Sequence, residues 1–141
     1  MKSARTALAD TGILYALADT SDDWHDRAVE SVGGFSGRLI VPASVLPEIC
    51  YLLNAYLGPS AETVFLDALV DREIPVESVT GPDIARAVAI LKRYADANIG
   101  FVDASIVAVA ERLRITAIYT TDRRHFSLVR PAHCPSFLLL P

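Results

Sequence analysis

The sequence has few of the residues that build disulfide frameworks, metal–thiolate sites or membrane spans. Its two cysteines, Cys50 and Cys134, lie far apart without metal-ligand spacing, so we expect two reduced thiols in a cytoplasmic protein. No apolar run approaches the roughly 18 residues that span a membrane. Met1–Asp10 also lacks the apolar core of a signal peptide, so we expect no contact with a membrane.

Motifs of several enzyme classes are also absent. The chain contains no P-loop and no GxGxxG, the loops that hold phosphates in many nucleotide-binding folds. The histidines His25, His125 and His133 are not spaced as a metal cluster. Neither Ser44 nor Ser105 has a histidine partner in a nucleophile arrangement, so a hydrolase triad is unsupported.

What is present is typical of one compact domain, which we expect to cover residues 1–141. Hydrophobic residues make up 52% of the chain, and repeats and linkers are missing. The net charge of −4 argues against a general nucleic-acid coat, but not against an enzyme that meets phosphate through a cation. Arginines are nevertheless concentrated near the C-terminal end, where they form either a solvated face or a rim for phosphate, at positions 112, 114, 123, 124 and 130.

Strand-like and helix-like segments alternate along the chain, which predicts an α/β fold around a mainly parallel sheet. The predicted strands are Arg5–Ala9, Arg38–Val41, Ile74–Val79, Ile115–Thr120 and an edge strand Phe137–Leu140. The predicted helices are Ile13–Ala18, Trp24–Val32, a helix capped by Ser44 and ending near Leu57, Ser60–Asp71, a helix capped by Thr80 and ending near Asp96, and one from Asp103 to Leu113.

Apolar spacing predicts which helical faces pack into the core. In the helix after Ser44 the predicted core positions are Val45, Ile49, Leu52 and Tyr56, and in the helix after Thr80 they are Ile84, Val88, Leu91 and Tyr94. The helix that begins near Asp103 has no charge from Ala104 to Ala110, so we expect it to be buried over most of its circumference.

Four acidic residues stand apart from the others, which lie in polar surroundings. Asp10 and Asp122 follow strands, Asp103 starts the buried helix, and Glu48 lies on a mostly apolar helix. Because the carboxyl ends of parallel strands share one edge of a sheet, these acids can converge there. For any one of them alone, a helix cap or an ion pair is the simpler explanation.

If these carboxylates converge, they need a proton or a cation. Two of them about 4 Å apart repel by roughly 4 kcal/mol at an effective dielectric constant near 20. Oxygen ligands without histidine or cysteine favour Mg²⁺ or Mn²⁺. Such an ion polarises a phosphate and activates a water, so phosphoryl chemistry is the expected activity.

Four motifs in this order, which together run from Asp10 to Phe126, resemble the PIN-domain family. Within it they are most similar to the VapC toxins of prokaryotic toxin–antitoxin pairs. The motifs are Asp10-Thr-Gly-Ile-Leu-Tyr-Ala-Leu17, Val45-Leu-Pro-Glu-Ile-Cys-Tyr-Leu-Leu53, Phe101-Val-Asp-Ala-Ser-Ile-Val-Ala-Val-Ala-Glu111 and Thr120-Thr-Asp-Arg-Arg-His-Phe126. At Gly12 the chain departs from the family, which often has serine or asparagine there.

The resemblance implies a three-layer α/β/α fold and an endoribonuclease that depends on Mg²⁺ or Mn²⁺ and uses a metal-activated water. It also implies a homodimer and a small antitoxin protein that blocks the site. Carried over by motif, the metal-site acids are Asp10, Glu48, Asp103 and Asp122, with Thr11 and Thr120 as polar supports.

The residues predicted to contact RNA are Arg112, Arg123, Arg124 and His125. Two other functions remain open from the sequence. One is a Mg²⁺-dependent phosphoacceptor or phosphatase with Asp10 as the nucleophile, although such enzymes usually need a lysine near the last acid and lysine occurs only at positions 2 and 92. The other is a PIN-like binding module without catalysis.

Overall fold

Five short parallel strands form the centre of the molecule in the computed structural model, which describes residues 5–141. Met1–Ala4, part of the segment in which no signal peptide is expected, lie outside the described residues. The sheet order is β3-β2-β1-β4-β5, and every pairing is parallel. The strands are β1 (Thr6–Ala9), β2 (Arg38–Pro42), β3 (Val76–Glu77), β4 (Ala117–Tyr119) and β5 (Leu138–Leu140). The predicted parallel sheet is confirmed.

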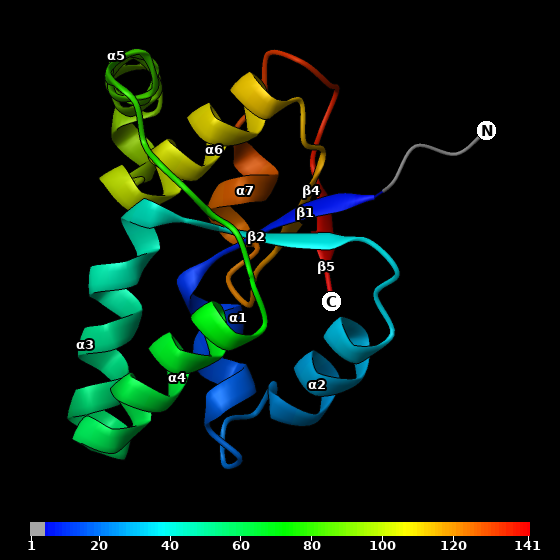
Figure 1. The fold of residues 1–141 in the computed structure, drawn as a ribbon. Coiled ribbons are helices and arrows are strands. Elements are labelled where there is room, and N and C mark those ends of the chain that lie inside the picture. Colours follow the sequence, from blue (N-terminus) through cyan, green and yellow to red (C-terminus); the bar gives the residue numbers. More distant parts are fainter. Residues whose placement is uncertain (1–4) are drawn as a thin grey trace.

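Helices cover both faces of this sheet, so the three-layer α/β/α fold is confirmed (Figure 1). The first layer contains α1 (Thr11–Ala18), α2 (His25–Gly33), α3 (Leu46–Leu57) and α4 (Pro59–Asp71). The second contains α5 (Gly81–Arg93), α6 (Phe101–Leu113) and α7 (Arg124–Leu128). Two short 3₁₀ turns, Ala43–Val45 and Ala95–Ala97, precede α3 and α6. None of the helices in residues 5–141 is long and apolar enough to cross a membrane.

The strand β1 and the helix α6 form the inner part of the core. β1 lies between β2 and β4, and its residues Ala7–Ala9 have no exposed surface. All residues of α6 from Ala104 to Ala110 are buried, which confirms the prediction made for this helix. A side chain at the end of β1 or in the first turn of α6 is therefore held by rigid, buried backbone.

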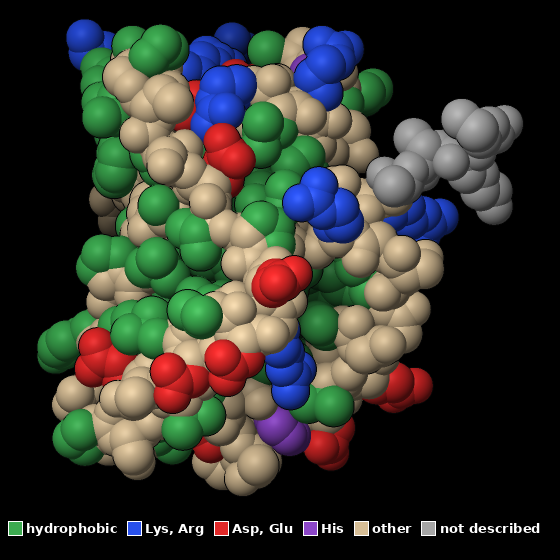
Figure 2. All heavy atoms as spheres, in the orientation of Figure 1, with side chains coloured by type: hydrophobic (Ala, Val, Ile, Leu, Met, Phe, Trp, Pro, Cys, Tyr) green, Lys and Arg blue, Asp and Glu red, His purple; other side chains and the backbone are tan. Residues whose placement is uncertain are grey.

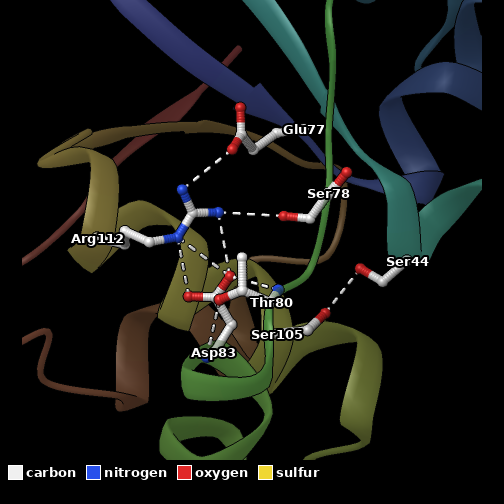
Figure 3. Close-up of polar contacts among 7 residues, drawn as sticks. All are labelled: Ser44, Glu77, Ser78, Thr80, Asp83, Ser105 and Arg112. Carbon is white, nitrogen blue, oxygen red and sulfur yellow. Dashed lines mark hydrogen bonds and ion pairs between the residues drawn. The ribbon is translucent and has the colours of Figure 1, made fainter.

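The prediction that Ser44 caps a helix is wrong. Residues Ala43–Val45 form a 3₁₀ turn, and the cap position of α3 is Val45, which makes no side-chain cap bond. The hydroxyl oxygen of Ser44 lies 2.7 Å from that of Ser105. Since Ser105 donates its proton to the carbonyl of Val102, Ser44 donates to Ser105 and joins the start of α3 to α6 (Figure 3).

Two predicted core faces are rotated in the structure. On α3 the residue buried after Ile49 is Leu53, while Tyr56 is 71% exposed and packs edge-on against Tyr15. On α5 the buried residues are Asp83, Ala87 and Ile90. Of the predicted core residues, Leu91 and Tyr94 do pack against the core, but Ile84 and Val88 are 46% and 41% exposed. The face of α5 turns because Asp83 points inward to an arginine of α6.

Candidate functional site

Asp10 lies at the point where the order of the strands reverses. It follows β1, which pairs with β2 on one side and β4 on the other, and its backbone N–H donates to Tyr119 at 2.9 Å. Open α/β sheets bind ligands in the crevice at such a point. Its carboxylate is also the N-cap of α1, where Oδ1 accepts the N–H of Thr11 at 2.7 Å, and the residue is 7% exposed.

Two buried threonines connect Asp10 to two of the other acids. The hydroxyl of Thr120 donates to Oδ2 of Asp10 at 2.9 Å and accepts the N–H of Asp122 at 3.0 Å. The hydroxyl of Thr11 donates to Oε1 of Glu48. These bonds orient the carboxylates from β1 and α3 and fix the backbone after β4, as the resemblance implies for the two threonines.

Asp103 comes to the same region from the first turn of α6. Its Oδ2 lies 2.8 Å from Nδ1 of His125, which belongs to α7. The side chain of Asp103 is 24% exposed, so one side of the carboxylate remains open.

The pKa shifts indicate that Asp10, Glu48 and Asp103 lie within electrostatic reach of one another, and that Asp122 lies within reach of Asp103. Burial, followed by the charges of Asp103 and Glu48, raises the pKa of Asp10 to about 6 despite its hydrogen bonds. Burial also raises the pKa of Asp103; the nearby charges of Asp122 and Glu48 add to this effect, and His125 opposes it. Excess negative charge is therefore concentrated at this edge of the sheet, and a cation would relieve it.

The acids fit a hard divalent cation. Among residues 5–141 no three histidine, cysteine or acidic side chains are drawn together as a ready-made metal cluster. Mg²⁺ does not require one, because it keeps several waters and binds through one or two carboxylates. Asp10 and Asp103 offer oxygen ligands, and their raised pKa values show that their negative charge is incompletely compensated. These are the properties expected of a Mg²⁺ or Mn²⁺ site.

Arg112, predicted to contact RNA, instead joins α6 to the start of α5 (Figure 3). Its guanidinium donates to Asp83 at 3.1 Å, to Glu77 at 3.0 Å and to the carbonyl of Ser78 at 3.1 Å. It is nine residues along α6 from Asp103, or about 13 Å. Each of its three guanidinium nitrogens thus has a protein partner, which holds Arg112 at the junction of α5 and α6.

The other predicted RNA contacts follow β4 directly. Arg123 and Arg124 are exposed, and the backbone N–H of Arg124 donates to Oδ1 of Asp122 at 3.2 Å. The guanidinium of Arg123 lies 5.9 Å from the ring of Trp24 and donates to the carbonyl of Pro141. No local pattern predicted the approach of Trp24 to Arg123, because it depends on the path of the loop before α2.

Gly12 is the position at which the chain departs from the motif that it resembles. A Cβ atom on Gly12 would lie 2.2 Å from the hydroxyl oxygen of Thr121, which occupies the space over the first turn of α1. The side chain missing at position 12 is thus replaced by a hydroxyl from the segment after β4. The glycine was visible in the sequence, but its partner was not, because the two residues are more than a hundred positions apart.

The three-layer fold and the acids at the carboxyl edge of its parallel sheet place this chain among the α/β proteins that have an acidic site at the strand ends, a site suited to a cation. Residues 7–130 match the family model of the PIN domain, and the chain belongs to that family. It is 32% identical over 134 residues to Ribonuclease VapC26 of Mycobacterium tuberculosis, an alignment that covers 95% of this chain and 99% of the relative.

Solved structures agree with this assignment. VapC20 of Mycobacterium tuberculosis, described as a sarcin–ricin loop cleaving toxin, matches with a TM-score of 0.78 and 26% identity over 83% of this chain and 90% of its own. VapBC2 of Rickettsia felis, solved with a DNA fragment from its promoter, matches with a TM-score of 0.69 and 15% identity over 95% and 96% of the two chains. The second likeness is one of fold alone.

Proposed function

We propose that this chain is a divalent-metal-dependent endoribonuclease and the toxin of a type II toxin–antitoxin pair. The observation that carries the proposal is the buried carboxylate of Asp10, whose pKa is raised by burial and by two facing acids at the strand-order reversal. The identity with a curated ribonuclease over nearly the whole of both chains supports the choice of RNA as substrate. We further propose that residues 1–141 form a single domain that acts in the cytoplasm.

In this proposal Asp10 and Asp103 hold Mg²⁺ or Mn²⁺, and Glu48 and Asp122 act through water or at a second metal position. Thr11 and Thr120 keep Glu48 and Asp10 in their orientations through the hydrogen bonds described above. When bound, the cation supplies Lewis acidity toward the scissile phosphate and lowers the pKa of water.

The arginines after β4 give this acidic edge its affinity for RNA. Arg123 and Arg124 are exposed beside Asp122 and can contact phosphates on either side of the cleaved bond. Because such contacts carry no sequence information, we expect their loss to weaken binding to all RNAs alike and to reduce its dependence on salt.

Cleavage of RNA by the purified protein tests the proposal. We expect cleavage with Mg²⁺ or Mn²⁺ and none in EDTA, and products that end in a 5′-phosphate and a 3′-hydroxyl. Asp10→Asn should reduce cleavage to background while the protein stays folded, and Asp67→Asn, an exposed acid on α4, should leave it unchanged. Full activity in EDTA would refute the proposal, and stable phosphorylation of Asp10 would favour the nucleophilic-aspartate alternative.

A small antitoxin and a second copy of the chain are the partners that we propose. Solved relatives of the same fold include VapBC from Salmonella typhimurium with DNA and a toxin–antitoxin complex from Klebsiella pneumoniae. Large apolar side chains are exposed on α3 and α4, the region where apolar groups gather in Figure 2; they include Tyr51, Tyr56, Val64 and Val70. Exposed apolar patches commonly mark protein interfaces.

The two partners can be tested separately. Light scattering of the purified chain should give the mass of a dimer. The product of the adjacent gene should form a complex with the chain and inhibit cleavage of RNA. A monomer at micromolar concentration, or a neighbouring product that leaves cleavage unchanged, would contradict the corresponding part of the proposal.

A further inference from the structure

His125 is held in one place by the short helix that carries it. α7 begins two residues after Asp122, and its next residue, Phe126, is 2% exposed and anchors the helix in the core. The backbone carbonyl of His125 accepts the N–H of Val129 at 3.1 Å, which closes the turn. The imidazole is therefore presented to its surroundings by a fixed backbone, with 16% of its side chain exposed.

The fixed imidazole is directed at Asp103. The distance of 2.8 Å from Nδ1 to Oδ2 of Asp103 is that of a strong hydrogen bond, and a carboxylate can only accept it, so Nδ1 carries the proton. One ring nitrogen of His125, a residue predicted to contact RNA, is thus already used by an acid of the site. The bond joins the segment after β4 to the first turn of α6, two elements that bring different acids to the same edge.

A partly exposed acid such as Asp103, if it has no partner, samples several rotamers, and a cation that binds it must select one of them. A hydrogen bond to one oxygen of Asp103 removes that freedom, while Oδ1 and the second lone pair of Oδ2 stay available. Metal-binding carboxylates in proteins are commonly held by such partners, whose loss lowers metal affinity or activity by about 10–100-fold.

We propose that His125 is a positioning residue, which donates from Nδ1 to Asp103 and holds that carboxylate in the orientation that receives the divalent cation. This inference rests on the proposed function, because it assigns a role toward the same metal site. It replaces the predicted contact of His125 with RNA by a contact with the protein.

Binding of Mn²⁺, measured by calorimetry and by electron paramagnetic resonance, tests the proposal on the intact chain without RNA. His125→Leu should weaken Mn²⁺ binding by about 10–100-fold. His125→Asn, whose amide nitrogen falls near the position of Nδ1, should stay within about threefold of the wild type. His125→Gln, whose amide falls near Nε2 instead, should behave like the leucine variant. Circular dichroism should show that all three variants are folded.

His25 is a matched control. Like His125, it is partly buried and has its Nδ1 close to an oxygen. This oxygen, at 2.7 Å, is the backbone carbonyl of Ala16 in α1. His25→Leu should therefore leave Mn²⁺ binding unchanged. Cleavage by His125→Leu should recover as the Mn²⁺ concentration is raised, whereas a lost RNA contact would raise KM at every Mn²⁺ concentration.

The outcomes separate this inference from the proposed function. Equal Mn²⁺ binding by His125→Leu and the wild type, with binding lost in Asp103→Asn, would overturn the role of His125 alone. An asparagine variant as weak as the leucine variant would also overturn it, because the hydrogen bond would then not be the cause. A wild-type chain that binds no Mn²⁺ would overturn the proposed function together with this inference.

Discussion

At the scale of single residues, the carboxylate of Asp10 lowers the stability of the folded protein when it is charged. It is buried beside two other acids, and its two hydrogen bonds, from Thr11 and Thr120, do not offset the loss of water. In the absence of a cation such a group reduces its charge by retaining a proton, which connects the stability of the protein to pH.

The first prediction concerns this connection. In EDTA the folded chain retains a proton on Asp10 up to about pH 6, whereas the unfolded chain loses it near pH 3.8. The contribution of Asp10 to the free energy of unfolding should therefore fall as the pH rises from about 4 to 6, by at most about 3 kcal/mol, and level off above; the difference between the wild type and Asp10→Asn isolates it from the acids whose pKa is lowered, such as Asp83 and Glu111. Urea denaturation at several pH values measures the effect.

Asp10→Asn removes the charge and serves as the control for this measurement. If the amide oxygen keeps the N–H of Thr11, the amide nitrogen faces Thr120 and cannot accept from it, but that hydroxyl also lies 2.9 Å from the carbonyl of Asp122 and can donate there. At pH 7.5 in EDTA we expect Asp10→Asn to be more stable than the wild type by about 1–2 kcal/mol, the relief of charge less the lost bond. A difference that does not shrink toward pH 4 would contradict this explanation.

The second prediction concerns Gly12 and Thr121. Gly12→Ala alone places a methyl group on the hydroxyl of Thr121, while in Gly12→Ala/Thr121→Ala the nearest atom of residue 121 is an ordinary 3.5 Å away. The double variant should be more stable than the sum of the two single changes by about 1 kcal/mol. Thermal unfolding of the four proteins gives this coupling, and strictly additive effects would show that the two side chains do not compete for space.

The positions of the candidate acids in the fold were predictable, but their hydrogen bonds were not. Asp10, Asp103 and Asp122 were recognisable as acids at strand ends or at a buried helix start, because position in an α/β fold follows from local pattern. The bonds from His125 to Asp103 and from Ser44 to Ser105 join residues 22 and 61 positions apart. Contacts of this kind depend on how whole elements pack, which no local spacing records.

At the scale of elements, Arg112 fixes the angle between α5 and α6. Asp83 is 3% exposed, and although burial raises its pKa, the hydrogen bonds from Arg112 and Thr80 bring the pKa below its ordinary value. The same aspartate closes the capping box with Thr80 at the start of α5. One buried charge therefore sets both where α5 begins and which of its faces meets α6.

The third prediction follows from this contact. Arg112→Gln should lower the free energy of unfolding by about 2–3 kcal/mol, because it leaves Asp83 buried without its charged partner. Arg130→Gln, at an exposed arginine, is the matched control and should change stability by less than about 0.5 kcal/mol. Weaker RNA binding by Arg112→Gln at unchanged stability would show that Arg112 contacts RNA after all.

The rotated faces of α3 and α5 show where helical periodicity stops being informative. On α5 the predicted face starts at Ile84, one position from the true face, which includes Asp83. Apolar spacing alone predicted that Asp83 faces solvent, because its partner Arg112 lies on another helix and does not enter the count. A pattern of apolar spacing predicts that a helix has a buried face, and the ion pair decides the rotation.

At the scale of the whole molecule, binding of a cation should stabilise the fold. A ligand present at a hundred times its dissociation constant raises the free energy of unfolding by about 2.7 kcal/mol. For a chain of this size, saturating Mn²⁺ should therefore raise Tm by roughly 10 °C above the value in EDTA. Differential scanning calorimetry measures the shift, which Asp103→Asn should abolish. An equal shift in that variant would place the bound ion elsewhere.

The hydrogen bond between Asp10 and Thr120 also has a consequence for folding kinetics. It joins residues 110 positions apart, across the pairing of β1 with β4. Closing so long a loop is slow, and parallel pairing offers no short hairpin as an alternative nucleus. All residues from Asp10 to the segment after β4 must therefore be synthesised and folded before the acids meet. Chains that stop before Asp122 should therefore lack the proposed nuclease activity, which a series of C-terminally truncated chains would test.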